Sequence, residues 1–272
     1  MNILYVAEIV GKAGVYAFKT VLPGIVKQYA VDCVIACCDG ATGSRGLGKN
    51  HAAYLHKLGA RVITTGDYCF FKKDLVESLE QTLYVLRPAN LNPDAPGFGS
   101  RIFKIGAEKM AVVALLGQSG FDRFHSNNPF TALPALLETL RQETPYIVVD
   151  FHAQATAEKY TLFNIADGLC SAVIGSHCRV QTADEAVMPG GTARIADAGR
   201  TGSTASVGGT GKTARINFYL SGIPEWTRET WDDIELQGVL IQIDKSGKAV
   251  NIERIRRSVK APKDMDMKNE TI

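Results

Sequence analysis

The chain is organised around the stretch Val173-Ile174-Gly175-Ser176-His177-Cys178-Arg179-Val180-Gln181-Thr182. A β-branched run ends there in a glycine, and His177 follows at the point where a strand would pass into a loop. Open α/β sheets present their chemistry at the carboxyl ends of their strands. A single histidine at such a place is more often an ordinary polar residue, so the interpretation needs support from other strands.

Four other predicted strands end in the same way, in an acid or a histidine. Glu8, Asp39 and Asp67 follow the first three apolar runs of the chain, and His152 follows the run 147–149. Carboxylates and imidazoles are ligands that suit iron, manganese or zinc. The simpler alternative is that Asp67 and Glu8 cap the helices that follow them.

Hydrophobic periodicity predicts strands that alternate with helices early in the chain, and hairpins in the middle and at the end. The expected strands are 2–10, 31–36, 61–65, 101–105, 110–116, 146–149, 171–175, 194–198, 236–243 and 249–255. The expected helices are 15–29, 49–58, 72–83, 130–142, 156–168 and a short one near 217–220. This order favours a mixed-sheet α/β sandwich over a purely parallel sheet.

The segment 199–211 is rich in glycine, serine and threonine, and this composition predicts a long mobile loop. Its end, Gly208-Gly209-Thr210-Gly211-Lys212-Thr213, looks like the end of a phosphate-binding P-loop. That motif requires a glycine where Ser206 stands and a strand directly before it. A flexible surface loop is therefore the better interpretation.

Composition sets the broad class of the protein. The 272 residues are 46% hydrophobic and 21% charged, with a formal net charge of +2, which is ordinary for a globular protein and lacks the basic footprint of a nucleic-acid binder. No apolar run is long enough to span a bilayer, and the N-terminus shows no signal peptide. We expect a cytoplasmic protein with one domain over 1–258 and a polar, disordered tail over 259–272.

The six cysteines lack the pairing of a zinc ribbon and the density of a disulfide scaffold. They are expected to be reduced thiols that act as small buried apolar residues. A soft-metal or redox role stays open for those near the strand ends, which are Cys37, Cys38, Cys69 and Cys178.

A set of short motifs gives the chain a family resemblance. They are Val10-Gly11-Lys12, Ser44-Arg45-Gly46-Leu47, Arg87-Pro88-Ala89-Asn90, Asp150-Phe151-His152-Ala153, Thr156 with Glu158-Lys159, Val180-Gln181-Thr182-Ala183-Asp184-Glu185 and Pro189-Gly190-Gly191-Thr192-Ala193. In register from residue 1 to about 255, the chain resembles the YmdB-like branch of the calcineurin-like metallophosphoesterases. The resemblance implies two facing mixed β-sheets flanked by α-helices, and a cytoplasmic phosphodiesterase with a two-metal centre of iron or manganese. It also implies cyclic nucleotides as substrates, with 2′,3′-cyclic AMP the usual candidate.

The resemblance also implies a ligand set for each of the two metals. One metal would be held by Asp39, Asp67, His152 and His177, all of which can ligate. The second metal would use Glu8, Asp39 and the residues at positions 40 and 179.

This second set is incomplete in the present sequence. The resemblance implies an aspartate where Glu8 stands, an asparagine at Gly40, and histidines at Tyr68 and Arg179. Gly40 and Arg179 cannot ligate a metal, and Tyr68 occupies the position of the implied catalytic histidine. Arg179 instead brings a permanent positive charge to the place of the second cation.

Two functions follow from this pattern. The favoured one is a divergent, pseudoenzyme-like homologue that binds one metal, a phosphate ligand or both, with weak or no phosphodiesterase activity. In it, Arg179 forms a structural salt bridge with Glu8 or Asp39. The alternative is an active mononuclear phosphodiesterase on cyclic nucleotides, with Arg179 as phosphate clamp and Tyr68 as acid. A generic α/β protein is disfavoured by the length of the resemblance.

Cofactor and partners are expected to be few. We expect one divalent metal ion, iron, manganese or zinc, or none. The expected partner is a small phosphate-containing ligand or a cyclic nucleotide, rather than a membrane or a nucleic-acid duplex. A homo-oligomer stays open.

Overall fold

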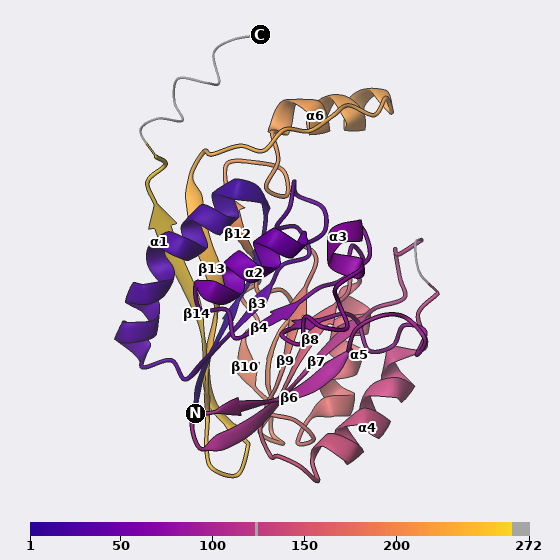
Figure 1. Cartoon of the computed structure of the whole chain (residues 1–272), viewed down its shortest axis with the longest axis vertical. Coiled ribbons are helices and arrows are strands. Elements are labelled where there is room, and N and C mark those ends of the chain that lie inside the picture. Colours follow the sequence, from indigo (N-terminus) through magenta and orange to yellow (C-terminus); the bar gives the residue numbers. More distant parts are fainter. Residues whose placement is uncertain (123–124, 263–272) are drawn as a thin grey trace.

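Two β-sheets face each other, and helices cover their outer faces (Figure 1). This computed structural model describes residues 1–122 and 125–262. In chain order the elements are β1 (Asn2–Val6), β2 (Glu8–Ile9), α1 (Gly11–Tyr29), β3 (Cys33–Cys37), α2 (Lys49–Lys57), β4 (Val62–Thr64), α3 (Lys73–Val76), β5 (Val85–Leu86), β6 (Ser100–Ile105), β7 (Glu108–Leu116), α4 (Pro129–Leu140), β8 (Ile147–His152), α5 (Thr156–Ala166), β9 (Ala172–Ser176), β10 (Ala186–Val187), β11 (Ala193–Ile195), β12 (Arg200–Ser203), α6 (Lys212–Ser221), β13 (Ile234–Ile243) and β14 (Ala249–Val259).

Both sheets are mixed. The first has the order β2-β12-β13-β1-β3-β4-β5, with β14 paired to β13, and the second has the order β10-β11-β9-β8-β7-β6. In the first sheet β1, β3, β4 and β5 run parallel, whereas β13 joins β1 and β14 antiparallel. In the second, β7, β8, β9 and β11 run parallel. The predicted mixed-sheet sandwich is confirmed.

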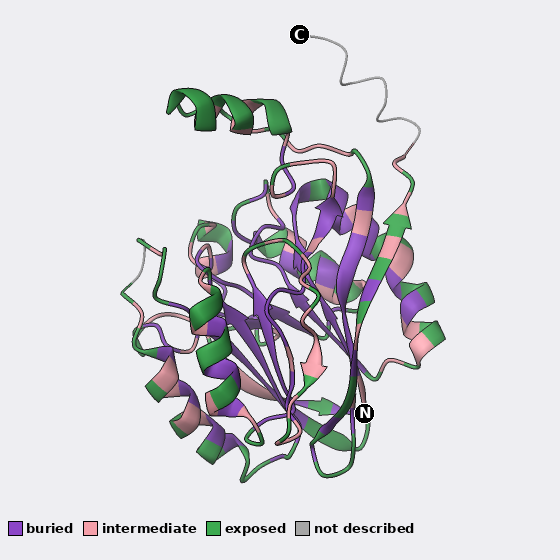
Figure 2. Cartoon of the chain, turned by 180° about the vertical axis from the view of Figure 1, so that it is seen from behind, coloured by how far each residue is buried: buried purple, intermediate pink, exposed green. Residues whose placement is uncertain are grey.

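Alternation along the strands divides the apolar side chains between three layers of core. Tyr5 and Val148 point into the space between the sheets, because successive side chains of a strand face opposite ways. Leu4 faces the layer under α1 and α2, and Val149 faces the layer under α4 and α5. Figure 2 shows this burial along the strands of both sheets.

Some predicted elements differ from the structure. The predicted helix over 72–83 is reduced to the single turn α3. Downstream of it, the Ser78 hydroxyl donates to Asp74 O at 3.2 Å and Thr82 Oγ1 donates to Ser78 O at 2.7 Å. Side chains that bond to nearby backbone compete with regular helix, and apolar periodicity does not record this competition.

The predicted mobile loop over 199–211 is wrong in its first half. β12 lies within it, pairing with β2 on one side and β13 on the other. Its Arg-Thr-Gly-Ser sequence carries no apolar alternation, so periodicity could not find it. The helix expected near 217–220 is also longer, because α6 begins at Lys212.

The elements near both ends of the chain have other bounds than those predicted. The predicted first strand is divided into β1 and β2, and α1 begins directly at Gly11 and continues through Pro23. β14 extends to Val259, and the part of the predicted disordered tail over 263–272 lies outside the described residues. Within the described chain, no helix has the length and apolar character needed to cross a membrane.

Candidate metal centre

The carboxyl ends of four strands bring acids and histidines to one place between the sheets. Asp39 follows β3 and Asp67 follows β4, both in the first sheet. His152 ends β8 and His177 follows β9, both in the second sheet. Parallel strands place their carboxyl ends at the same edge of a sheet, so the facing sheets contribute two residues each.

Three of these side chains form a tight cluster. His152 Nε2 lies 3.0 Å from Asp67 Oδ1 and 3.0 Å from His177 Nδ1. One ligand atom from each of the three residues lies within 4.8 Å of the others. Asp39 lies beside this cluster, with its Oδ2 3.7 Å from His152 Nε2. The arrangement offers oxygen and nitrogen ligands around one small volume.

The backbone fixes the orientation of Asp39. Its Oδ1 accepts a hydrogen bond of 2.6 Å from the Gly66 amide, and its Oδ2 accepts one of 3.1 Å from the Tyr68 amide. Gly66 is required here for a second reason. A Cβ at this position would lie 2.3 Å from the His152 ring, so any side chain would displace the histidine.

A buried relay holds the His152 ring from behind. Ser176 Oγ donates to Asp150 Oδ1 at 2.6 Å, and His152 Nδ1 lies 3.1 Å from the same hydroxyl. A serine hydroxyl has a single proton, so the Ser176 oxygen accepts from His152 Nδ1–H. Nδ1 therefore keeps its proton, and Nε2, the atom that faces the cluster, is the one that can bind either a proton or a metal. Such outer partners commonly orient metal-binding histidines.

Burial and proximity perturb the titration of the cluster. Burial raises the pKa of Asp39 to about 7, opposed by His152 and reinforced by Asp67 and Glu8. Burial lowers the pKa of His152, but the hydrogen bond with Asp67 and the nearby carboxylates outweigh it and raise this pKa to about 9. The carboxylates therefore favour a positive charge at this site, and either a proton or a metal cation can provide it.

The other half of the site is occupied by an arginine. Arg179 Nη2 donates to Glu8 Oε1 at 2.6 Å and Nη1 donates to Gly208 O at 2.9 Å. A Cβ at Gly40 would lie 2.8 Å from Arg179 Nη2 and 2.9 Å from Glu8 Oε1. The absence of a side chain at position 40 therefore makes room for the guanidinium.

Two residues of the loop that follows β9 have unusual backbone angles. His177 has φ 93° and Arg179 has φ 60°, in the region that favours glycine. Residues with side chains adopt it only when the surroundings impose it, and such residues gather at functional sites. Both side chains line the same cavity of about 750 Å³, together with Glu8, Asp67 and Tyr68.

Comparison with known proteins shows the family of this chain. A family model described as YmdB-like protein matches residues 4–255. The chain belongs to the YmdB-like family. It is 34% identical over 256 residues to a 2′,3′-cyclic-nucleotide 2′-phosphodiesterase of Bacillus subtilis, covering 94% of this chain and 96% of the relative.

Solved structures of similar chains share the fold. One from Mycoplasma pneumoniae, described as a novel phosphatase, superimposes with a TM-score of 0.90 at 29% identity, covering 95% of this chain and 93% of that one. A hypothetical protein from Thermus thermophilus gives a TM-score of 0.88 at 29% identity, covering 95% and 99%. The fold predicted from the resemblance to the YmdB-like family is confirmed.

The residues predicted for the YmdB-like site are brought together, and their roles remain proposals. Asp67, His152 and His177 form the cluster, Asp39 adjoins it, and Glu8 pairs with Arg179. The helix-capping alternative is wrong, because the N-caps of α1 and α3 are Val10 and Lys72. Cys178 is exposed, whereas the other five cysteines are buried as expected.

Sequence reasoning missed several residues of the site. Ser176 and Asp150 lie directly beside predicted ligands, but nothing in their spacing indicates the relay they form. Ser44 has a buried hydroxyl that lacks a hydrogen-bond partner among the described residues, and it lines the cavity. Ser44 begins the Ser-Arg-Gly-Leu motif that supports the family resemblance, and this motif is the signal by which it could be found.

The residues present fit one metal ion and do not fit two. Asp67, His152 and His177 with the adjoining Asp39 offer a donor set suited to iron, manganese or zinc. Glu8, the acid expected at a second metal, instead pairs with the Arg179 guanidinium at 2.6 Å. The donor set therefore suits a single cation.

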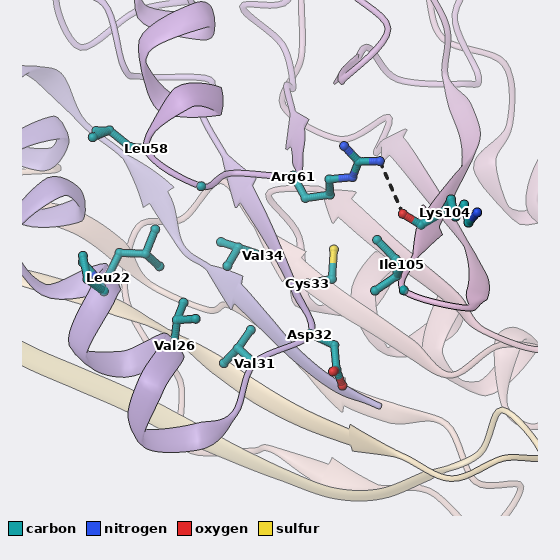
Figure 3. Close-up of a pocket in the computed structure, with 13 residues that line it drawn as sticks. Leu22, Val26, Val31, Asp32, Cys33, Val34, Leu58, Arg61, Lys104 and Ile105 are labelled. Carbon is teal, nitrogen blue, oxygen red and sulfur yellow. Dashed lines mark hydrogen bonds between the residues drawn. The ribbon is translucent and has the colours of Figure 1, made fainter.

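A second cavity lies at the opposite ends of the strands and contains none of these groups. It measures about 490 Å³ and is lined by residues of α1, the start of β3 and the β6–β7 hairpin. Figure 3 shows Arg61, whose Nη2 donates to Lys104 O at 3.3 Å at the rim of this cavity. It is separate from the candidate metal centre.

Proposed function

We propose that this chain is an active metal-dependent phosphodiesterase that uses one divalent cation and the fixed charge of Arg179. The observation that carries the proposal is the cluster of Asp67, His152 and His177, whose ligand atoms lie within 4.8 Å of one another. Arg179 lines the same cavity as two members of this cluster. The cation and the guanidinium would both bind oxygens of one phosphate group.

Asp39, Asp67, His152 and His177 would hold the cation. When bound, a divalent metal polarises phosphate oxygens and lowers the pKa of a water molecule to make a nucleophile near neutral pH. The rest of the site would position the substrate and stabilise the charge that develops on it.

Arg179 is suited to bind a phosphate oxygen. Three hydrogen bonds, to Glu8, Ser44 O and Gly208 O, engage its five N–H donors in part, and at least two donors are left for a ligand. Its pKa is raised because the Glu8 carboxylate outweighs the opposing effect of burial. The charge is therefore permanent, and the ion pair fixes its position before substrate arrives.

Two hydroxyl groups complete the phosphate site. The buried Ser44 hydroxyl lacks a partner among the described residues, and it can donate to a phosphate oxygen. Tyr68 lines the cavity and follows Asp67 directly, so its hydroxyl is our candidate for the acid that protonates the leaving oxygen.

Cyclic nucleotides such as 2′,3′-cyclic AMP are the proposed substrates. The proposal draws on the name of the Bacillus subtilis relative, which is similar over 94% of this chain. A cavity of about 750 Å³ is also of the size that holds small organic ligands.

The pseudoenzyme interpretation favoured by the sequence gains no support from these comparisons, and the active alternative is closer to the relatives. Loss of two ligands counted heavily in that interpretation. The guanidinium of Arg179, 2.6 Å from Glu8, would supply the charge that a second metal would have brought. The lost ligands and the gained charge thus offset each other.

The test is turnover with a defined metal. The purified protein, supplied with Mn²⁺, Fe²⁺ or Zn²⁺ in turn, should hydrolyse 2′,3′-cyclic AMP and bis(4-nitrophenyl) phosphate. His177→Ala should lower the rate by about 10²-fold or more, as when one catalytic contact is lost. His56→Ala is the matched control, since His56 stacks on Tyr84 outside the site. A protein that binds one equivalent of metal yet hydrolyses neither compound would contradict the proposal.

A further inference from the structure

A projecting segment forms one wall of the catalytic cavity. Residues 212–227, which we call the arm, consist of α6 and the extended chain that follows it. None of the residues of α6 is buried, and Figure 1 shows the helix standing off from both sheets. A helix of ten residues without packing is marginal in water, so its position requires an explanation.

The root of the arm is fixed. Gly211 N donates to Arg228 O at 2.8 Å, and Thr210 forms an antiparallel bridge with Glu229. The Glu229 carboxylate accepts from the Lys12 amide at 3.0 Å, in the first turn of α1. Both ends of the arm are thereby joined to each other and to α1.

The same root is connected to the proposed phosphate clamp. Arg179 Nη1 donates to Gly208 O at 2.9 Å, and Val207 bridges Thr210 just before the arm begins. A hydrogen bond and two residues therefore separate the guanidinium from the root. The arm therefore begins next to Arg179, the residue proposed to bind the phosphate.

One side of the arm faces the cavity. Arg215, Tyr219 and Trp226 line it, along with Pro224 and Glu225. Tyr219 is 79% exposed and Trp226 is 95% exposed, so neither ring is used in the core of the chain. Ion pairs of Arg215 with an acid are absent from the part of the chain that the structure describes.

The aromatic pair is distinct from the apolar side of the arm. Ile216 and Leu220 lie one helical turn apart on α6 and are 49% and 82% exposed, but they do not line the cavity. The rings of Tyr219 and Trp226 thus belong to the wall of the catalytic site rather than to this stripe.

We propose that Trp226 and Tyr219 form a subsite that stacks the nucleobase of the substrate while Arg179 holds its phosphate. The proposal rests on the proposed function, and it deepens it by naming the residues that select nucleotides over other phosphodiesters. Aromatic side chains stack on every base, because every base has a π-face. At exposed rings we expect a weak stacking effect, an approximately 5- to 10-fold change in affinity.

The experiment measures binding without turnover. Adenosine 3′-monophosphate and inorganic phosphate are titrated separately into the metal-loaded protein, by calorimetry and by tryptophan fluorescence. Adenosine monophosphate should quench the fluorescence and phosphate should not. Trp226→Ala should raise the Kd for adenosine monophosphate about 5- to 10-fold, leave the Kd for phosphate unchanged, and Trp226→Phe should restore the affinity.

Leu220→Ala is the matched control on the other side of the arm, and it should bind as the unmodified protein does. An equal loss of affinity in this control would overturn the subsite. So would a change in the oligomeric state of Trp226→Ala, measured as the molecular mass in solution, that accompanies its loss of affinity. Base-dependent binding without turnover would uphold the subsite and reject the proposed function. Turnover of 2′,3′-cyclic AMP that is unchanged in Trp226→Ala and Tyr219→Ala would reject the subsite and uphold the proposed function.

Discussion

At the residue scale, Arg179 and Gly40 are matched to each other. The guanidinium occupies space that a side chain at position 40 would need, since a Cβ there would approach Nη2 to 2.8 Å. It also neutralises Glu8, whose side chain is 1% exposed. Removing Arg179 alone would leave a buried carboxylate without a counter-charge, which is strongly destabilising.

The double substitution Gly40→Asn with Arg179→His should therefore raise metal content from one ion per chain toward two. Asparagine and histidine supply ligands at the two positions where none exists now. Metal analysis by inductively coupled plasma mass spectrometry measures the stoichiometry. Gly40→Asn alone, with Arg179 still in place, is the control and should stay at one. Two ions per chain in the unmodified protein would contradict our account of the site.

Ser176→Ala should weaken metal binding by about 10- to 100-fold, because the Ser176 hydroxyl fixes the His152 ring from behind. The Kd for Mn²⁺ or Zn²⁺, measured by competition with a chelating dye, tests this. Ser246→Ala removes a hydroxyl from the distant β13–β14 turn and should leave the Kd unchanged. An unaltered metal Kd in Ser176→Ala would show that the relay has no influence on the ligand.

The residues of the cluster, and Asp39 beside it, could be predicted from the sequence because each one ends or follows an apolar strand. Asp39, Asp67, His152 and His177 follow this rule, and parallel strands bring such residues together. The relay through Ser176 and the aromatic wall could not be predicted in this way. The relay depends on the direction in which the Ser176 and Asp150 side chains point. The aromatic wall lies on the arm, a segment that is not part of the pattern of strands.

At the scale of elements, the motif 180–185 that supported the resemblance has a structural role. Gln181 Nε2 donates to Gly238 O at 3.0 Å. Thr182 Oγ1 accepts from Asp197 N at 2.9 Å, and Glu185 pairs with Arg254 at 2.7 Å. These contacts connect the loop that carries His177 and Arg179 to β11, β13 and β14. The motif therefore holds the site without contributing a ligand.

Asp184 gives this loop a pH dependence. Burial raises its pKa, but hydrogen bonds from Thr182, the Ala196 amide and Tyr160, with the charge of Arg194, outweigh burial and lower it. A carboxyl whose pKa is lowered by folding stabilises the protein above its unfolded pKa of about 3.9, and the stabilisation disappears as the pH falls through the folded value.

Asp184→Asn should thus cost on the order of 1 kcal/mol in the free energy of unfolding at pH 7, after allowance for partial exposure. The difference from the unmodified protein should shrink as the pH falls below about 4. Urea unfolding at several pH values measures it. Asp94→Asn, in an exposed turn, is the comparison. A difference that persists undiminished at low pH would argue against a charge effect.

Prediction of elements succeeded where a strand or helix has a buried apolar face, and failed where polar contacts define it. The β6–β7 and β13–β14 hairpins were found from alternation alone. β12 was missed because it contains Arg200 and Ser203 and owes its place to pairing with β2 and β13. Hydrogen bonds between strands leave no periodic trace in a polar sequence.

At the scale of the whole molecule, the core does not depend on the metal centre. The layer between the sheets is apolar and continuous, and the ligands lie at its edge. Chelation of the metal with EDTA should leave a single cooperative thermal transition. The melting temperature should fall only by the mass-action contribution of binding to the native state, so it should recover in proportion to added metal. A chelated protein without a cooperative transition would contradict this.

The position of β1 has a consequence for the synthesis of the chain. β1 lies between β3 and β13, and Tyr5 pairs with Val239. β1 therefore keeps an open edge until β13, which begins at Ile234, has been synthesised. Contacts of such high sequence separation form slowly, and open edges recruit other strands. We expect nascent chains stalled before residue 234 to bind chaperones or aggregate, because β13 is then missing.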